Sequence, residues 1–260
     1  MTTRVCVLGP SGRMGRAVID AAAGRSDVRI VAAVDRAGAP GLGESAGGVV
    51  ATADLAAGIA GCDVYVDFTT PAATRAAADA ARAQRRAAVI GTTGMGRDDE
   101  AAIAALAAVA PVVVAANFSL GVNLVLGLVR TAARVLGPDW DAEVVEAHHR
   151  AKRDAPSGTA LMIARAIAAG HGVDYEQVKR HARDGDIGPR PRGEIGVSTV
   201  RGGDVVGEHT ALFLGPAERL EITHRASSRA IFAAGALRAA AWVAGQPPGR
   251  YDMQAVLGLA

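Results

Sequence analysis

The first 35 residues constrain the fold more than any other part of the chain. An apolar run from Arg4 to Leu8 includes β-branched residues and is typical of a buried parallel strand. The turn Gly9-Pro10-Ser11-Gly12-Arg13-Met14-Gly15 follows directly, and helix-forming residues continue from Arg16 to Ala23. A second strand, Val28–Val34, ends at Asp35. This order of strand, glycine turn, helix, strand and acid predicts a dinucleotide-binding βαβ unit.

The glycines of this turn recur at every third position and not in the common G-x-G-x-x-G spacing. Taken alone, such a triplet is as often a tight turn without a ligand. In this context the glycines permit a close backbone approach to a pyrophosphate, and the helix N-terminus favours its negative charge. Asp35 can accept hydrogen bonds from a ribose hydroxyl, and Arg36 can face a 2′-phosphate. We therefore expect a dinucleotide cofactor and the use of both NADH and NADPH.

Strands and helices alternate through the first half of the chain. Strands are expected at Cys62–Phe68, Ala87–Ile90 and Pro111–Ala116, and helices at Ala72–Arg82 and at about Asp98–Val109. Such alternation predicts a parallel sheet covered on both faces, with ligands bound outside the carboxyl ends of its strands. Polar and glycine-rich segments fall at those ends, namely Gly9–Gly15, Asp35, Phe68-Thr69-Thr70, Gly91–Gly94 and Ala115–Phe118.

The pattern changes near Leu120. A helix at about Val122–Leu136 and a strand at Ala142–Ala147 are expected, followed by a helix at Ala160–Ala169. Further strands are expected without intervening helices, and their short turns predict an antiparallel meander. These strands are Ile195–Arg201, Val205–Leu214 and Arg219–Ala226.

The predicted fold class is α/β, with a Rossmann-like doubly wound parallel sheet and a second α+β domain that carries an antiparallel or mixed sheet. The Ala-rich helix Ser228–Ala244 is expected to pack back against the first domain. The expected dinucleotide-binding domain is therefore 1–119 plus 229–260, and 120–228 forms a substrate-binding and oligomerisation domain.

The segment from Glu146 to Ala160 is the richest in chemistry. His148 and His149 can carry protons near neutral pH, and Lys152 supplies a cation or an acid. The turn Pro156-Ser157-Gly158-Thr159 opens a helix whose first backbone N–H groups bind anions well. Proton donors and an anion cradle thus lie side by side, which suits an enzyme that acts on a small, negatively charged substrate.

Plainer interpretations of these residues exist. Neighbouring strand residues point to opposite faces, so His149 could be a packing residue. Glu146 and His148 share a face, as metal ligands would, but a transition-metal site needs three or four protein ligands and no third lies at useful spacing. We therefore expect no metal. Lys152 could be a solvated surface lysine, although an arginine would serve as well in this Arg-rich chain. His209 could be structural or line the cleft, and the same holds for His224.

The global composition agrees with a soluble cytoplasmic enzyme. The formal net charge is +2 and the basic residues are scattered, which gives nucleic-acid binding no support. No uninterrupted apolar stretch approaches the length of a membrane span, and the N-terminus shows no export signal. Cys6 and Cys62 lie in or beside apolar strands, so we expect two reduced, buried thiols.

Specific motifs recur in order along the whole chain. The most specific is His148-His149-x-x-Lys152-x-Asp154-Ala155-Pro156-Ser157-Gly158-Thr159. The others are Gly9-x-x-Gly12-Arg13-Met14-Gly15, Val66-Asp67-Phe68-Thr69, Gly91-Thr92-Thr93-Gly94, Ala115-Ala116-Asn117-Phe118-Ser119, Val200-Arg201-x-Gly203-Asp204, Gly207-Glu208-His209-Thr210 and Leu220-Glu221-Ile222-Thr223-His224. With these motifs the chain resembles the bacterial dihydrodipicolinate reductase family, now called 4-hydroxy-tetrahydrodipicolinate reductases, of the diaminopimelate–lysine pathway.

The resemblance implies reduction of a cyclic dicarboxylate, 4-hydroxy-tetrahydrodipicolinate, to tetrahydrodipicolinate with NADH or NADPH. It implies that His148 is the proton donor and acceptor and that Lys152 is the second donor. His149 is implied to bind a substrate carboxylate, and the backbone N–H groups at Gly158 and Thr159 are implied to hold a carboxylate at the helix start. Two other function classes stay open: another two-domain amino-acid dehydrogenase, such as an aspartate dehydrogenase, and a non-catalytic NAD(P) sensor.

On the cofactor side the resemblance implies pyrophosphate contacts from the glycine turn, ribose contacts from Asp35 and 2′-phosphate contacts from Arg36. The implied pyrophosphate residues are Gly9, Pro10, Ser11, Gly12, Arg13 and Met14. The implied nicotinamide-flanking residues are Gly91, Thr92 and Thr93 with Ala115, Ala116, Asn117 and Phe118. The resemblance further implies a homotetramer. The apolar residues of the expected meander agree with it, because helices of one small domain can cover only one sheet face.

Overall fold

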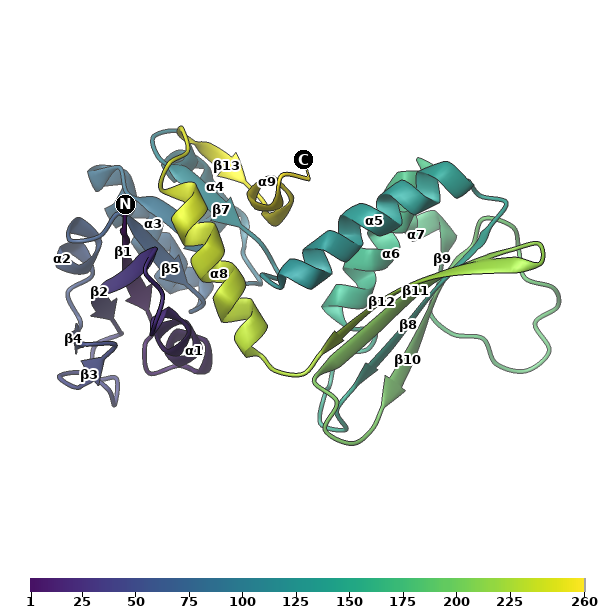
Figure 1. Cartoon of the computed structure of the whole chain (residues 1–260), viewed down its shortest axis with the longest axis horizontal. Coiled ribbons are helices and arrows are strands. Elements are labelled where there is room, and N and C mark those ends of the chain that lie inside the picture. Colours follow the sequence, from purple (N-terminus) through teal and green to yellow (C-terminus); the bar gives the residue numbers. More distant parts are fainter. Residues whose placement is uncertain (260) are drawn as a thin grey trace. The chain divides into compact units, whose positions relative to one another are not determined.

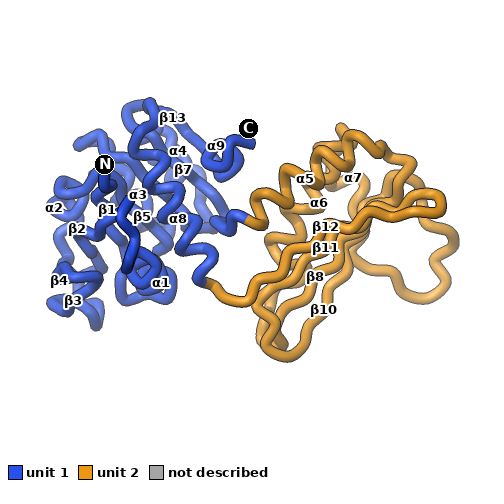
Figure 2. The backbone as a smooth tube through the Cα atoms, in the orientation of Figure 1, with its two compact units in different colours: residues 1–120, 230–260 blue, residues 121–229 orange. Residues whose placement is uncertain are grey.

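The computed structural model describes residues 1–259 and divides into two compact units (Figure 2). The first unit consists of Met1–Leu120 and Ala230–Ala260, and the second of Gly121–Arg229. Among residues 1–259, none of the helices is both long enough and apolar enough to cross a bilayer.

Unit 1 is built on an eight-stranded sheet with the order β13-β7-β6-β5-β1-β2-β4-β3. Neighbouring strands pair in parallel, except for the antiparallel hairpin β3–β4. The strands are β1 (Thr3–Leu8), β2 (Val28–Val34), β3 (Ser45–Ala46), β4 (Val49–Thr52), β5 (Val64–Asp67), β6 (Ala87–Ile90), β7 (Pro111–Val114) and β13 (Gly249–Tyr251). The helices are α1 (Arg13–Ala22), α2 (Leu55–Ala60), α3 (Pro71–Gln84), α4 (Arg97–Ala107), α8 (Ala230–Val243) and α9 (Met253–Leu257).

Strand alternation explains why both faces of this sheet are covered. Val5 and Val7 of β1 join a core with α1, α8 and α9, whereas Cys6 and Leu8 join a second core with α2, α3 and α4. Figure 1 shows α8 lying across the strands on the same side as α1. The predicted doubly wound, Rossmann-like sheet is thus confirmed, and both cysteines are free and buried.

Unit 2 contains a five-stranded mixed sheet with the order β12-β11-β8-β10-β9. Its strands are β8 (Asp141–His148), β9 (Lys179–Arg180), β10 (Ile195–Arg201), β11 (Gly207–Gly215) and β12 (Glu218–Ala226). The helices α5 (Leu120–Leu136), α6 (Gly158–His171) and α7 (Tyr175–Val178) pack on one face (Figure 1). The core between helices and sheet includes Val129, Ile163, Ile167 and Phe213, each at most 1% exposed.

The expected antiparallel meander is wrong for its first strand. β10 does not pair with β11, because β8 lies between them, parallel to β10 and antiparallel to β11. The chain between β8 and β10 contains α6, which packs on the sheet, and a strand that returns after such a crossover lies parallel to the first. Only β11 and β12 form the hairpin that their short turn predicts. β8 therefore becomes the central strand, and its carboxyl end carries His148.

The other face of this sheet exposes apolar side chains within unit 2. Val145, Val200 and Leu214 are 36%, 52% and 36% exposed, and the strand register puts them on the face opposite to the core residues Val144 and Phe213. Thr210 and Thr223 bond to each other across the β11–β12 pair at 3.0 Å. An apolar β face of this kind is a candidate association surface.

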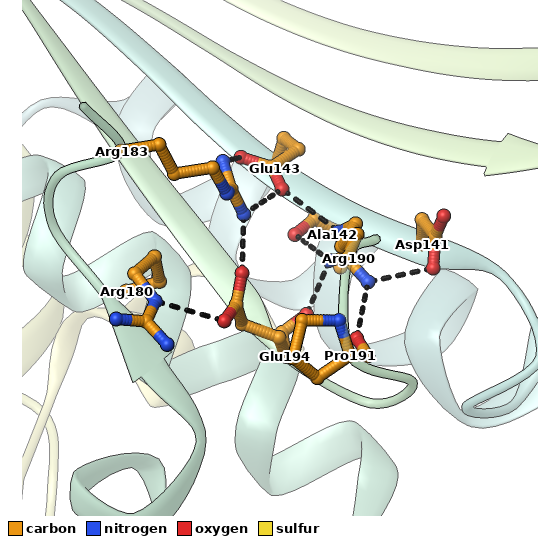
Figure 3. A network of polar contacts seen from close by, with 8 residues as sticks. All are labelled: Asp141, Ala142, Glu143, Arg180, Arg183, Arg190, Pro191 and Glu194. Carbon is orange, nitrogen blue, oxygen red and sulfur yellow. Dashed lines mark hydrogen bonds and ion pairs between the residues drawn. The ribbon is translucent and has the colours of Figure 1, made fainter. Parts of the chain in front are cut away.

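A network of arginines and carboxylates holds the long loop before β10 against the sheet (Figure 3). Arg183 bonds to both Glu143 and Glu194, at 2.7 Å for its Nη2–Glu143 Oε1 contact. Arg190 bonds to Asp141 at 2.6 Å and to Glu143 at 3.1 Å. Burial alone would raise the pKa of Glu194, but the bonds from its arginine partners outweigh that effect and lower it. The network lies at the starts of β8 and β10. It therefore holds the ends of these two strands that are farthest from His148.

Candidate active site

The glycine turn forms a tight loop between β1 and α1. Gly9 has φ +68°, and its carbonyl accepts a hydrogen bond from Gly12 N at 2.9 Å. A Cβ at Gly15 would overlap the Gly9 carbonyl, and a Cβ at Gly9 would lie 2.8 Å from Thr69 Cγ2. Glycine is therefore required at both positions, and the backbone here is left bare for a close-approaching pyrophosphate.

Asp35 faces this turn from the end of β2. Its Oδ2 accepts hydrogen bonds from the Ser11 hydroxyl and from Ser11 N, the latter at 3.1 Å, and its Oδ1 accepts from Arg36 N at 2.8 Å. Burial alone would raise the pKa of Asp35, but the bonds from Ser11 and the Arg36 backbone outweigh it and lower it. The carboxylate is thus ionised and able to accept from a ribose hydroxyl.

A cavity of about 500 Å³ lies beside these residues at the carboxyl edge of the sheet. Its lining brings the glycine turn, the end of β2 and the segment after β5 together, and it includes Gly9, Ser11, Gly12, Asp35, Arg36, Phe68, Thr69 and Thr70. The residues fit an adenosine dinucleotide, because bare backbone, a ribose acceptor and a cation for a 2′-phosphate share one cavity.

Asp67 connects the segment after β5 to the predicted cofactor loop after β6. This carboxylate is fully buried at the end of β5 and accepts from the Thr69 hydroxyl and the Thr74 hydroxyl, both at 2.5 Å. Thr92, after β6, donates to Asp67 at 3.3 Å and accepts from Thr69 N at 3.1 Å. The Thr69 and Thr92 segments therefore have a fixed spacing at the sheet edge.

Aromatic contacts extend this arrangement to the predicted cofactor loop Ala115–Phe118, which follows β7. Gly91 packs directly on the Phe68 ring, so a side chain at residue 91 would overlap it. Phe68 in turn meets Phe118 edge to face, with ring centroids 5.4 Å apart. Phe118 is 1% exposed, so its side chain supports the site from the core, while Ala115 and Ala116 stay partly or fully exposed.

The histidine of β8 is paired with a buried carboxylate. His148 Nδ1 lies 2.6 Å from Glu146 Oε2, two residues earlier on the same strand face. Glu146 is fully buried and His148 is 8% exposed. Burial lowers the pKa of His148, an effect that Lys152 and Arg201 reinforce and that Glu146 opposes.

Glu146 accepts hydrogen bonds from three further residues, two on β10 and one before α6. Arg201 at the end of β10 donates from Nη1 to Oε2 and from Nη2 to Oε1, each at 2.8 Å. Ser157 N and Thr199 Oγ1 donate to Oε1 at 3.0 and 3.2 Å. Burial alone would raise the pKa of Glu146, but the bonds from Arg201, His148 and Ser157 outweigh it and lower the pKa to about 2.

Ser157 connects this pair to the start of α6. Its hydroxyl accepts from Ala160 N at 3.2 Å as the helix cap and contacts His209 Nε2 at 3.0 Å. The His209 ring meets the His148 ring edge to face at 5.1 Å, and burial lowers the pKa of His209 to about 4. His209 is therefore neutral and part of the wall behind His148.

The loop after β8 presents Lys152 and His149. Lys152 Nζ bonds to Asp154 Oδ1 at 2.9 Å, and its side chain is 20% exposed. His149 follows the end of β8, and its backbone N donates to Val205 O at 2.7 Å. His149 is half-buried in the segment that follows β8. Within residues 1–259 no group of three or more metal-ligating side chains is assembled.

Comparison with protein families matches residues 3–118 to "Dihydrodipicolinate reductase, N-terminus" and residues 121–257 to "Dihydrodipicolinate reductase, C-terminus". The chain belongs to the dihydrodipicolinate reductase family. It is 51% identical over 267 residues to the 4-hydroxy-tetrahydrodipicolinate reductase of Alkalilimnicola ehrlichii, with 100% of each chain covered. A relative of the same name from Anaeromyxobacter dehalogenans is 48% identical over 265 residues, covering 99% of this chain and 98% of its own.

A solved structure of this family has the same fold. It is the dipicolinate-bound dihydrodipicolinate reductase from Paenisporosarcina sp. TG-14, with a TM-score of 0.81 and 25% identity, and it covers 97% of this chain and 98% of its own. The predicted family and fold class are therefore confirmed.

Sequence reasoning missed several residues that support the candidate site residues within each unit. Arg201 and Thr199 are distant from Glu146 along the chain, and the β8–β10 pairing that brings them together was not predicted. The motif around Asp67 predicts no role for this residue, although an acid inside an apolar strand is itself a signal, because a buried charge must be paired or hydrogen-bonded.

Proposed function

We propose that the chain reduces 4-hydroxy-tetrahydrodipicolinate to tetrahydrodipicolinate with NADH or NADPH, in the diaminopimelate–lysine pathway. Membership of the dihydrodipicolinate reductase family makes the chain an NAD(P)H-dependent oxidoreductase. The observation that carries the substrate class is the buried Glu146–His148 pair beside Lys152 and the start of α6. This combination offers a proton and an anion cradle, as a cyclic dicarboxylate requires.

The roles of the unit 2 residues follow from that chemistry. The reaction adds a hydride and a proton and releases water, and the bound nicotinamide supplies the hydride. His148 gives the proton, with Lys152 as the second donor and as a cation against negative charge that develops on the ring. His149 and the backbone N–H groups of Gly158 and Thr159 hold the substrate carboxylates. We assign nucleotide binding to unit 1 and a cytoplasmic location to the enzyme.

A coupled assay tests this function. The product of dihydrodipicolinate synthase is supplied to the purified chain, and the loss of NADH or NADPH absorbance is followed. Oxidation that depends on that product is expected. If neither nicotinamide is oxidised with this or another dicarboxylic imine, the reductase assignment fails and a non-catalytic NAD(P) sensor is favoured.

We propose that Arg36 contributes to NADPH use. Arg36 lines the unit 1 cavity beside Asp35, where a guanidinium can pair with a 2′-phosphate in bidentate geometry. Wild-type catalytic efficiencies for NADH and NADPH are expected within roughly tenfold of each other, which corresponds to about 1.4 kcal/mol. Arg36→Ala should raise KM for NADPH much more than KM for NADH. Arg82→Ala, at an exposed arginine of α3, serves as the control and should leave both values unchanged. Equal losses for both cofactors in Arg36→Ala would show that Arg36 does not contact the phosphate.

We propose that the enzyme is a homotetramer assembled through the open face of the unit 2 sheet. Val145, Val200 and Leu214 supply apolar surface on that face, and soluble oligomers are usually closed and symmetric. Light scattering at micromolar concentration should report about four times the 26.3 kDa chain mass. Val200→Asp should lower the measured mass, whereas the control Val135→Asp, on the exposed side of α5, should not. A wild-type monomer, or equal masses for Val200→Asp and wild type, would contradict this assembly.

A further inference from the structure

We propose that Glu146 and Arg201 are positioning residues that fix the His148 ring. They make Nε2 the atom that takes up and releases the transferable proton. The inference deepens the proposed reductase function and rests on it. Its physical basis is the set of donors that converge on one buried carboxylate from β8, from β10 and from the segment before α6.

The ionisation state of Glu146 determines which nitrogen of His148 donates to the carboxylate and which is left to exchange a proton. An ionised carboxylate can only accept hydrogen bonds, and the pKa of Glu146 is about 2. His148 Nδ1, at 2.6 Å, must therefore be the donor in this contact. Neutral His148 then has its lone pair on Nε2, and protonated His148 has its transferable proton there.

A glycine lies beside Nε2. Gly207 begins β11 next to the ring, and a Cβ at that position would lie 3.0 Å from His148 Nε2. Any larger residue at position 207 would therefore crowd Nε2. Nδ1 is occupied by Glu146, and the edge-to-face contact with His209 limits rotation of the ring.

Arg201 sets the charge of the pair. A buried carboxylate without a counterion would hold the proton on His148, because its charge raises the pKa of the imidazole. Arg201 makes a bidentate contact with Glu146, and its own charge acts on His148 in the opposite direction. The imidazole can therefore release its proton although a carboxylate touches it.

The same two residues tie His148 to the anion-binding start of α6. Arg201 Nη2 donates to Asp154 O at 2.7 Å, and Ser157 N donates to Glu146 Oε1 at 3.0 Å. Both bonds anchor the segment that precedes Gly158. The proton-carrying atom and the carboxylate cradle therefore keep a fixed spacing, which proximity effects in catalysis require.

Opposite shifts of the pH profile test the assignment. If His148 donates the proton, kcat/KM falls as pH rises through its pKa. Glu146→Gln removes the charge that raises this pKa, so the falling limb should move to lower pH, with kcat reduced on the order of 10- to 100-fold, as for other partners that orient a functional imidazole. Arg201→Met removes a charge that lowers the pKa, so the limb should move to higher pH. Glu176→Gln makes the same chemical change on the surface of unit 2 and should leave the profile unchanged.

A spectroscopic readout separates this inference from the proposed activity and from folding failure of the variants. Wild-type protein labelled with ¹⁵N-histidine, with the His148 signals assigned by their loss in His148→Gln, should show neutral His148 protonated at Nδ1. A neutral His148 protonated at Nε2 and not at Nδ1 would overturn the inference. So would falling limbs of Glu146→Gln and Arg201→Met that do not move, or that move in the same direction. An inactive wild-type enzyme with the Nδ1–H tautomer would contradict the proposed substrate and leave the positioning role supported.

Discussion

His148→Gln is expected to lower kcat by about 10²- to 10⁴-fold, the usual cost of losing a positioned general acid. Glutamine can keep a hydrogen bond to Glu146, but it cannot carry and release a proton near neutral pH. The fold should tolerate the change, because the side chain lies at the end of β8 and is similar in size. Steady-state rates with saturating NADH and the synthase product measure the effect.

The assignment of His148 as proton donor also predicts the direction in which kcat/KM of the wild-type enzyme changes with pH. Burial holds the pKa of His148 below its ordinary value of 6.5 in the free enzyme. A donor must be protonated, so kcat/KM should decrease as pH rises through that lowered pKa. His148→Gln should lose this limb, while its Kd for NADH stays near that of wild type. His181→Gln, at an exposed histidine bonded to Tyr175, is the matched control. A His148→Gln turnover within threefold of wild type would refute the assignment.

Lys152→Ala is expected to produce a loss of similar size, about 10²- to 10⁴-fold in kcat. Lys152 is 20% exposed and bonded to Asp154, and its charge acts on His148. Two functions are assigned to it, a proton donor and a cation near the ring, and Lys152→Arg separates them. Arginine keeps the positive charge, but it does not deprotonate in proteins. Partial recovery in Lys152→Arg indicates the electrostatic function, and no recovery indicates proton donation.

A second lysine of the same chain provides the control for Lys152. Lys179 is the other lysine, and it is exposed and paired with Glu176, so Lys179→Ala should retain wild-type kcat. NADH affinity should be unchanged in all three variants, because Lys152 belongs to unit 2 and the glycine turn to unit 1. If Lys152→Ala keeps more than a third of wild-type turnover, Lys152 is a surface residue and the second donor must be sought elsewhere.

Local signals were sufficient to predict much of unit 1. Val28–Val34 and Ala87–Ile90 are strands with the predicted bounds, because each is a short apolar run between polar or glycine-rich segments. The hairpin β3–β4 and the strand β13 were missed. Two- and three-residue strands have little pattern of their own, and β13 forms where β7 offers an edge to pair with.

The sequence by itself was sufficient to predict the family, the glycine turn with its acid, and the candidate residues for the proton chemistry, because these depend on local order and on residue type. The tertiary structure decided what surrounds His148. The crossover through α6 inserts β8 between β10 and β11, and this pairing places Arg201 opposite His148 in register and brings Thr199 opposite Glu146. Residues 55 positions apart thereby become partners of one buried carboxylate. Such partners depend on strand pairing over long separations, which hydrophobic periodicity does not encode.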